Sequence, residues 1–231
     1  MILVIDPGGN YPEISCFNKL AGFSSVPLLY AIPALFPFDF TPFKENENLK
    51  GIILLGAGFT VDSDINWLTA LRQFLEESIE KEIPFLGICF GHQLLAHIFG
   101  IGVKFIKPIA ENYKKRGIEK ISICMEGQTI FNGLEKEFYA VASHREEVDD
   151  LNDNFLLLAS APYSKNQVIK LKGKECYGFQ THIEAEEEFL KKAEIPYEKG
   201  GKQHLLQQKH SEILLRNFFQ ICYGGRYEQR S

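Results

Sequence analysis

Short apolar runs that stop at glycine or polar residues recur along the first half of the chain. Residues 2–5, 49–55 and 85–88 have the near-continuous hydrophobicity of strands that are buried on both faces of a parallel sheet. Between the last two runs, apolar residues recur at helical spacing from Ile65 to Ile79, with charged residues on the opposite face. This order of strand, helix and strand predicts an open, mostly parallel α/β sheet with helices packed on it.

The second half of the chain has a different pattern of hydrophobic and polar residues. Strand-like segments follow one another in hairpin-like succession with polar turns between them, which predicts an antiparallel extension of the sheet. We expect these strands at residues 118–125, 138–142, 155–159, 167–171 and 176–180, with turns at Ser164-Lys165-Asn166 and Lys172-Gly173-Lys174. Residues 11–24 and 205–221 are expected to be the first and the closing helix, and residues 185–203 a charged helix followed by a loop.

The segment Gly87-Ile88-Cys89-Phe90-Gly91 lies where the third apolar run gives way to a helical pattern. It has the form of the nucleophile elbow, G-x-S-x-G, with sulfur in place of the hydroxyl oxygen. Such a turn crowds the backbone, so residues without a Cβ are favoured two positions to either side of the nucleophile. The turn would lift the Cys89 sulfur to the carboxyl end of the sheet, at the positive end of the next helix.

The elbow also suggests where an oxyanion could bind. The backbone N–H of Phe90 at the start of the helix is one donor, and the N–H of Ala57, in the loop Gly56-Ala57-Gly58 after the neighbouring strand, is a second. Two plainer interpretations stay open on these residues alone. Cys89 could be a small buried hydrophobic residue, and the glycine loop could be an ordinary turn from strand to helix.

A histidine and a carboxylate follow the last predicted strand. Residues two apart at a strand end point to the same side, so His182 and Glu184 can share one face near the sulfur. His182 would then take the thiol proton while Glu184 orients the ring and stabilises the imidazolium. The spacing is common by chance, and its position after a late strand is what makes it notable. Another histidine, His144, could be a base, a substrate-loop residue or a solvated residue, and its polar neighbours favour the last.

Composition narrows the class of partner. The 231 residues carry a net charge of −5, which argues against a nucleic-acid or anionic-membrane partner, and no apolar run is long enough to span a bilayer. The five cysteines show no metal-ligand spacing, so we predict neither a disulfide framework nor a metal site, and no cofactor. The amino-terminal residues lack a basic leader, so we expect a cytoplasmic protein with a small-molecule substrate and one domain spanning residues 1–231.

Taken together, Gly-Ile-Cys-Phe-Gly-His-Gln around Cys89, the later His182 and Glu184 and the loop Gly56–Gly58 resemble the class I, triad-type glutamine amidotransferases. The resemblance runs from Met1 to the closing helix. Within that family, the opening Ile-Asp-Pro-Gly-Gly-Asn-Tyr and the elbow look most like the glutaminase part of GMP synthetase. It implies a flavodoxin-like fold: an open, mostly parallel twisted sheet with helices on both faces and an antiparallel extension.

The resemblance also implies an activity. Cys89 would attack the side-chain amide of glutamine to form a glutamyl thioester, with His182 and Glu184 completing the triad and the ammonia passing to a separate synthetase subunit. The family pattern places Gln93 along the glutamine pocket, and it places Ser143 and His144 in a loop that contacts substrate.

Two alternatives remain open from the sequence. The central proline common between the family's histidine and glutamate is absent, and no synthetase is encoded here. The chain could therefore be a stand-alone hydrolase of a larger γ-glutamyl amide or peptide. It could also be a non-catalytic regulatory subunit that keeps the fold.

Overall fold

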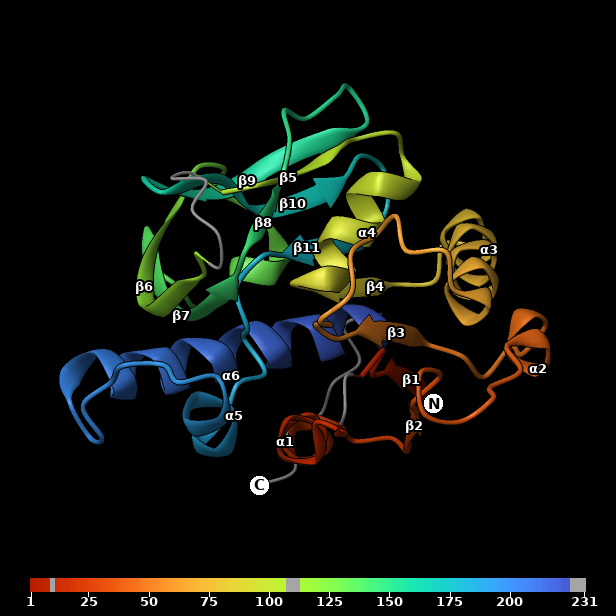
Figure 1. Cartoon of the computed structure of the whole chain (residues 1–231), viewed down its shortest axis with the longest axis horizontal. Coiled ribbons are helices and arrows are strands. Elements are labelled where there is room, and N and C mark those ends of the chain that lie inside the picture. The colour runs from red at the N-terminus through yellow and green to blue at the C-terminus, as the bar shows by residue number, and fades with distance from the viewer. Residues whose placement is uncertain (9–10, 107–112, 225–231) are drawn as a thin grey trace.

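The structure, a computed structural model, describes residues 1–8, 11–106 and 113–224 (Figure 1). In chain order its elements are β1 (Ile2–Ile5), α1 (Ile14–Phe23), β2 (Leu28–Ala31), α2 (Thr41–Lys44), β3 (Gly51–Leu54), α3 (Asn66–Glu80), β4 (Phe85–Ile88), α4 (Phe90–Ile98), β5 (Val103–Phe105), β6 (Lys115–Ile123), the 3-10 helix η1 (Thr129–Phe131), β7 (Glu137–His144), β8 (Glu146–Val148), β9 (Phe155–Ala161), β10 (Ser164–Leu171), β11 (Cys176–Phe179), α5 (Glu187–Lys192) and α6 (Lys202–Cys222).

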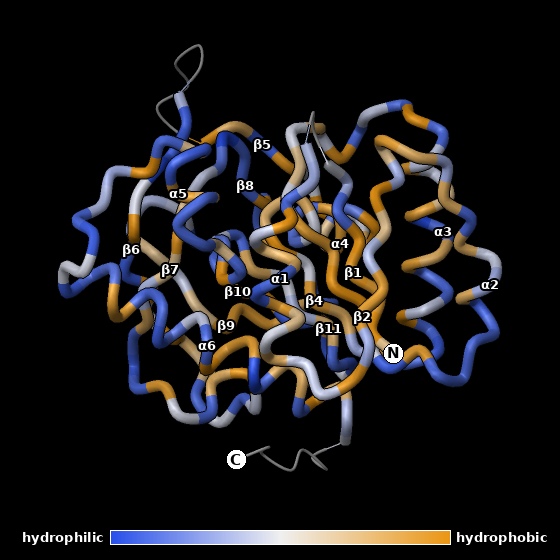
Figure 2. Tube along the Cα trace, turned by 90° about the horizontal axis from the view of Figure 1, so that it is seen from below, coloured by the Kyte–Doolittle hydropathy of each residue, from blue (hydrophilic) through white to orange (hydrophobic). Residues whose placement is uncertain are grey.

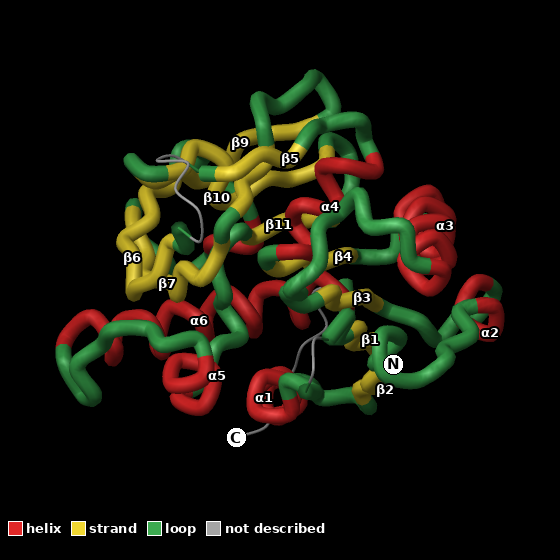
Figure 3. Tube along the Cα trace, viewed as in Figure 1, coloured by secondary structure: helices red, strands yellow, loops and turns green. Residues whose placement is uncertain are grey.

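One mixed sheet runs through the molecule. Within the described residues its strand order is β2-β1-β3-β4-β11-β10-β9-β6-β7, and the first five of these strands pair in parallel. The order β2-β1-β3-β4 followed by another parallel strand is that of flavodoxin-like sheets. The remaining strands pair antiparallel and form the extension seen in yellow beyond β11 (Figure 3). The predicted fold class is therefore confirmed.

Both faces of the parallel half are covered, which explains its uninterrupted apolar runs. In β1, Ile2 and Val4 lie in a buried cluster with residues of α1 and α6, whereas Leu3 and Ile5 lie in a second cluster with residues of α3 and α4. The most hydrophobic segments accordingly gather in the interior around β1 and β4 (Figure 2). Burial on both faces leaves the strand ends as the place where polar chemistry can face solvent.

Two predicted loops belong to strands instead. Residues 164–166 begin β10, and the turn that precedes this strand falls at Pro162 and Tyr163, so the predicted position of the turn was wrong. Ser143 and His144 are the last two residues of β7, and only 3% of His144 is exposed. The interpretation of His144 as a solvated loop histidine is therefore wrong. The polar sequence misled because these strands bury polar side chains.

The turn between β4 and α4 depends on two close backbone approaches. A Cβ placed on Gly87 would lie 2.3 Å from the carbonyl oxygen of Gly91, and one on Gly91 would lie 2.4 Å from the carbonyl oxygen of Leu54. Neither backbone oxygen can move aside as the end of a flexible side chain could. The glycines at both positions are thus required by crowding, as the elbow pattern predicts.

We therefore expect Gly91→Ala to lower the free energy of unfolding by about 2–3 kcal/mol, because the added methyl group overpacks α4 against β3. The measurement is equilibrium unfolding in urea. The control is Gly22→Ala in α1, where a Cβ meets nothing within 4 Å and an alanine should leave stability unchanged or raise it by up to about 1 kcal/mol. Equal stabilities of the two variants would show that the close approach to Leu54 has no energetic weight.

Candidate active site

Cys89 has a backbone conformation that few residues with a side chain adopt. It lies between β4 and α4 with φ 52° and ψ −99°, and it is one of the few non-glycine residues with positive φ in the described chain. Such a conformation costs about 1–3 kcal/mol and persists only where the surroundings enforce it. The residue is held from both sides: its N–H donates to Phe179 O at 2.7 Å, and its carbonyl accepts from Gln93 N–H at 3.1 Å.

The structure brings His182 and Glu184 to the same place as Cys89. The His182 backbone N–H donates to Val141 O at 2.7 Å, which fixes the segment after β11 against β7. Its Nδ1 lies 2.8 Å from Glu184 Oε1, and the Cys89 sulfur is close enough to the imidazole to raise its pKa. Because Nδ1 is bonded to Glu184, Nε2 is the nitrogen left for the thiol. The three side chains thus form a continuous chain from sulfur to carboxylate.

The environment of His182 favours its protonated form. Burial lowers the pKa of His182, but the Glu184 carboxylate and the Cys89 sulfur, by charge and by hydrogen bonding, outweigh burial and raise this pKa to about 10. Gly56 contacts the same ring from the side, since a Cβ there would lie 2.8 Å from His182 Cε1. The surroundings of His182 therefore favour one position of the ring as well as its protonated form.

A cavity of about 430 Å³ opens at the carboxyl ends of the parallel strands, next to these three residues. Of the residues singled out from the sequence, it is bordered by Gly56, Ala57, Gly58, Cys89, Ser143, His182 and Glu184. Asp6 and Lys114 border it as well. A cysteine thiol, an imidazole and a glycine loop therefore face one space large enough for an amino-acid side chain.

Three of the predicted residues do not border this cavity. The Phe90 side chain is fully buried in the core, and only its backbone N–H, at the first position of α4, is placed to bind an anion. His144 points away, with Nδ1 2.9 Å from Glu146 O, and burial lowers its pKa to about 4. Gln93 is buried beneath the elbow, where its Nε2 donates to Glu146 O at 3.0 Å and to Gln180 Oε1 at 3.3 Å.

The structure also adds residues that the sequence analysis did not single out. Asp6, after β1, is fully buried and accepts from the N–H groups of Gly8 at 2.8 Å and Glu13 at 2.7 Å. It thereby joins Gly8 and Glu13, and the intervening Gly9 and Asn10 lie outside the described residues. Burial lowers the pKa of Lys114, which the Cys89 sulfur opposes. Nothing in the sequence marks Lys114, because it lies far from every motif.

Gln180 is another such residue, and a signal for it existed. It precedes His182 by two positions, as Glu184 follows it by two, so strand alternation places all three on one side. Its side-chain Nε2 lies 3.7 Å from Cys89 Sγ.

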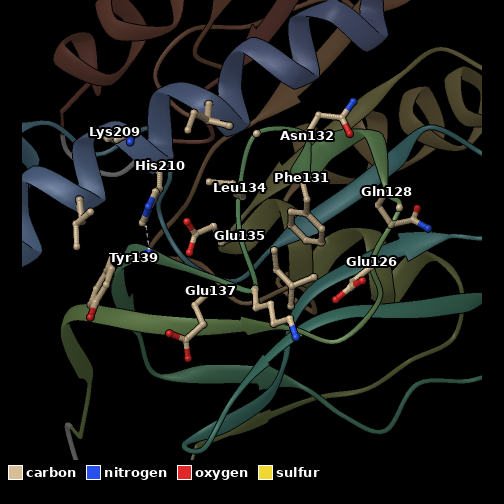
Figure 4. A pocket seen from close by; sticks show the side chains of 16 residues that line it. Glu126, Gln128, Phe131, Asn132, Leu134, Glu135, Glu137, Tyr139, Lys209 and His210 are labelled. Atoms are coloured by element: carbon tan, nitrogen blue, oxygen red, sulfur yellow. Dashed lines mark hydrogen bonds between the residues drawn. The ribbon is translucent and has the colours of Figure 1, made fainter.

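A second cavity, of about 1060 Å³, lies elsewhere, between the β6–β7 connection and α6 (Figure 4). Glu135, Glu137 and Tyr139 border it from one side and Lys209 and His210 from α6, but none of the described residues that line it is a cysteine. His210 Nδ1 accepts the hydrogen bond of the Tyr139 N–H at 2.9 Å, so this histidine pairs a backbone donor of β7. On β7, four residues or about 13 Å separate Tyr139 from Ser143 at the first cavity.

The described ranges contain no group of three or more His, Cys, Asp and Glu side chains arranged to hold a metal ion. None of the helices in these ranges combines the length and the apolar character needed to cross a bilayer.

Comparison with known proteins agrees with this geometry. The sequence model of the family described as Glutamine amidotransferase class-I matches residues 31–195. One subunit of the glutamine-hydrolyzing GMP synthase of Methanocaldococcus jannaschii is 29% identical over 229 residues, which cover 99% of this chain and 100% of that protein. The protein of the same name from Methanothermobacter thermautotrophicus is 30% identical over 184 residues, 80% of this chain and 88% of the relative.

A solved structure is similar along the whole chain. It is the crystal structure of a protein from Thermoplasma acidophilum that is described as a candidate for the same GMP synthase subunit. It matches with a TM-score of 0.72 at 26% identity and covers 97% of this chain and 94% of that one.

The charge on His182 can be tested by comparing the wild-type parent with Glu184→Gln. Because Glu184 and Cys89 together raise the pKa of His182 to about 10, the imidazole should be protonated at pH 8 in the parent, and Glu184→Gln should lower this pKa, since Cys89 alone then opposes burial. The measurement is NMR of the ring nitrogens. Since the pKa is raised in the folded state, the stability it contributes is present below pH 6.5 and is lost as pH rises through the folded-state pKa. A neutral ring at pH 8 in the parent would contradict the ion pair.

Proposed function

The chain belongs to the class I glutamine amidotransferase family, and we propose that it hydrolyses the side-chain amide of L-glutamine to glutamate and ammonia. The observation that carries this proposal is that Cys89, His182 and Glu184 lie together at the wall of one cavity, with His182 bonded to Glu184 and next to the sulfur. An amide needs a nucleophile, a proton for the leaving amine and a site for the oxyanion. These three side chains and the two neighbouring N–H groups meet those requirements.

In the first half of the proposed reaction, the Cys89 sulfur attacks the amide carbon and forms a tetrahedral intermediate. The N–H groups of Phe90 and Ala57 would bind the oxyanion, since one begins α4 and the other lies in the glycine loop that borders the cavity. The C–N bond then breaks as the protonated His182 gives its proton to the departing nitrogen. Ammonia leaves, and glutamate stays attached to Cys89 as a thioester.

In the second half, His182 takes a proton from water, which attacks the thioester carbon. The C–S bond breaks, the electron pair returns to sulfur and glutamate is released. Glu184 keeps the ring in one orientation and stabilises its charge through the 2.8 Å contact to Nδ1. Because the ring is buried and confined by Gly56, it can serve both halves with little movement.

We further propose that the ammonia serves a separate synthetase subunit of a GMP synthase. The curated relatives carry the name of one subunit of that enzyme, and they align with this chain over 80% to 99% of its length. The alignment with the Methanocaldococcus protein leaves no part of that relative uncovered. That these relatives are named as one subunit supports a separate partner that provides the synthetase reaction.

We expect Cys89→Ala to abolish ammonia release from glutamine, because the thioester cannot form without the sulfur. The assay measures glutamate and ammonia from the purified protein, alone and with the synthetase subunit of the same organism. Cys124→Ala is the matched control, since Cys124 is an exposed thiol outside the cavity, and should retain the wild-type rate.

Labelling separates this function from the alternatives. The glutamine-like electrophile diazo-oxo-norleucine should modify Cys89 in the wild-type protein and leave Cys124 unmodified. Wild-type protein that cleaves γ-glutamyl p-nitroanilide but not glutamine would favour the γ-glutamyl hydrolase. Protein that neither cleaves glutamine nor is labelled, even with the synthetase subunit present, would favour a non-catalytic subunit.

A further inference from the structure

A buried amide touches the sulfur of Cys89 and has no part in the reaction described above. Gln180 follows β11 and is fully buried. Its backbone N–H donates to Gln167 O at 2.9 Å, which ties it to β10, and its side-chain Nε2 lies 3.7 Å from Cys89 Sγ. Buried glutamine side chains carry a cost unless their polar atoms are bonded. The role of the Gln180 amide can therefore be inferred from its hydrogen-bond partners.

The orientation of the Gln180 side-chain amide is fixed by its hydrogen bond to Gln93, which in turn donates to a backbone carbonyl. Glu146 O can only accept, so the atom of Gln93 that lies 3.0 Å from it must be the donor Nε2. The same Nε2 lies 3.3 Å from the Gln180 side chain, so the Gln180 atom facing it must be the acceptor Oε1. That assignment leaves the Gln180 NH2 group facing the sulfur. The orientation is thus dictated by chemistry rather than by a choice between look-alike atoms.

A carboxamide N–H next to sulfur favours one state of the sulfur. It can donate to a thiolate but cannot take the thiol proton, which is the task of His182. Hydrogen bonds to an ionised group are about twice as strong as those between neutral groups. The contact therefore stabilises Cys89 most when its sulfur is negatively charged.

We propose that Gln180 is a further catalytic residue, whose Nε2–H donates to Cys89 Sγ and stabilises the thiolate, and that Gln93 is the positioning residue that aims it. The proposal rests on the proposed function, because it assigns a role in the same reaction. It gives Gln93 a task beneath the elbow in place of the pocket wall expected from the family pattern.

The step that needs this donor most is the release of glutamate. When the C–S bond of the hydrolysing thioester breaks, the electron pair goes to sulfur, which becomes a thiolate. A fixed N–H from Gln180 lies at the sulfur throughout and needs no proton transfer to act. Gln180 thus complements His182, which changes its charge during each half-reaction.

The test measures the alkylation of Cys89 by iodoacetamide across pH, read by mass spectrometry of the peptide that contains Cys89. Gln180→Met removes the donor without adding charge, and the midpoint of the rate profile should move up by about one pH unit. Gln180→Glu places a carboxylate against the sulfur and should move the midpoint further up. Gln93→Glu removes the Nε2 that orients Gln180 and should move it in the same direction by less.

Gln207 supplies the matched control. It is a buried glutamine of α6 whose Nε2 donates to Ser211 Oγ at 2.9 Å, away from the cavity. Gln207→Glu and Gln207→Met test for general effects of changing a buried amide, and their midpoints should equal that of the wild type. Folding of every variant is checked by circular dichroism, and the Glu and Met variants at position 180 give two independent chances of a folded protein.

The alkylation profile needs no glutamine, so it separates the two proposals. A wild-type protein without glutaminase activity, even with the synthetase subunit present, would overturn the proposed function, while an upward shift in Gln180→Met would still support the contact between amide and thiolate. An unchanged midpoint in folded Gln180→Met, with active wild-type protein, would overturn the role of Gln180 alone. An equal shift in the Gln207 variants would overturn it as well.

Discussion

The structure depends on a strained turn at Cys89 that two glycines make attainable. The positive φ of Cys89 is imposed because α4 starts where β4 ends, and this start is so close that a Cβ on Gly87 would overlap the backbone of Gly91. The same helix presses on β3, since Gly91 lies against Leu54 O. Strain at one residue is thus balanced by the packing of a whole helix on two neighbouring strands. This packing holds the backbone of Cys89 at the sheet edge, where its sulfur meets Gln180.

The second requirement is that distant segments end at the same edge. β4 and β11 are parallel neighbours, so Cys89 after one and His182 after the other emerge side by side although 93 residues separate them in sequence. The bridge between Val141 and His182 then brings β7 to the same place and delivers Ser143 to the cavity. Because β11 is the last strand in the sequence and lies in the parallel half of the sheet, the site needs segments from both ends of the chain.

The parts of the site that follow a strand periodicity could be predicted, and those that depend on packing between segments could not. Alternation places Gln180, His182 and Glu184 on one side, and the spacing of Gly87 and Gly91 identifies the elbow. His144 was misjudged because a polar sequence gives no sign that its strand is buried. Lys114 comes to the cavity from the start of the antiparallel extension, and no local pattern records that approach. The boundary of β10 was misplaced for a related reason, since Asn166 is buried and its Nδ2 donates to the carbonyls of Val148 and Asp149.

The buried polar side chains around the Cys89 sulfur differ in whether their hydrogen-bond partners fix which atom donates and which accepts. His92 follows the elbow and packs against Gly178, and burial lowers its pKa to about 3, so the ring stays neutral. A neutral imidazole can carry its proton on either nitrogen, so its tautomer adapts to the surroundings. By contrast, the side-chain amide of Gln93 donates to that of Gln180 and to a carbonyl of β8. These bonds allow only one orientation of the two amide groups. That direction points a donor at the Cys89 thiol that borders the cavity, so a carbonyl of β8 helps to orient a side chain at the turn between β4 and α4.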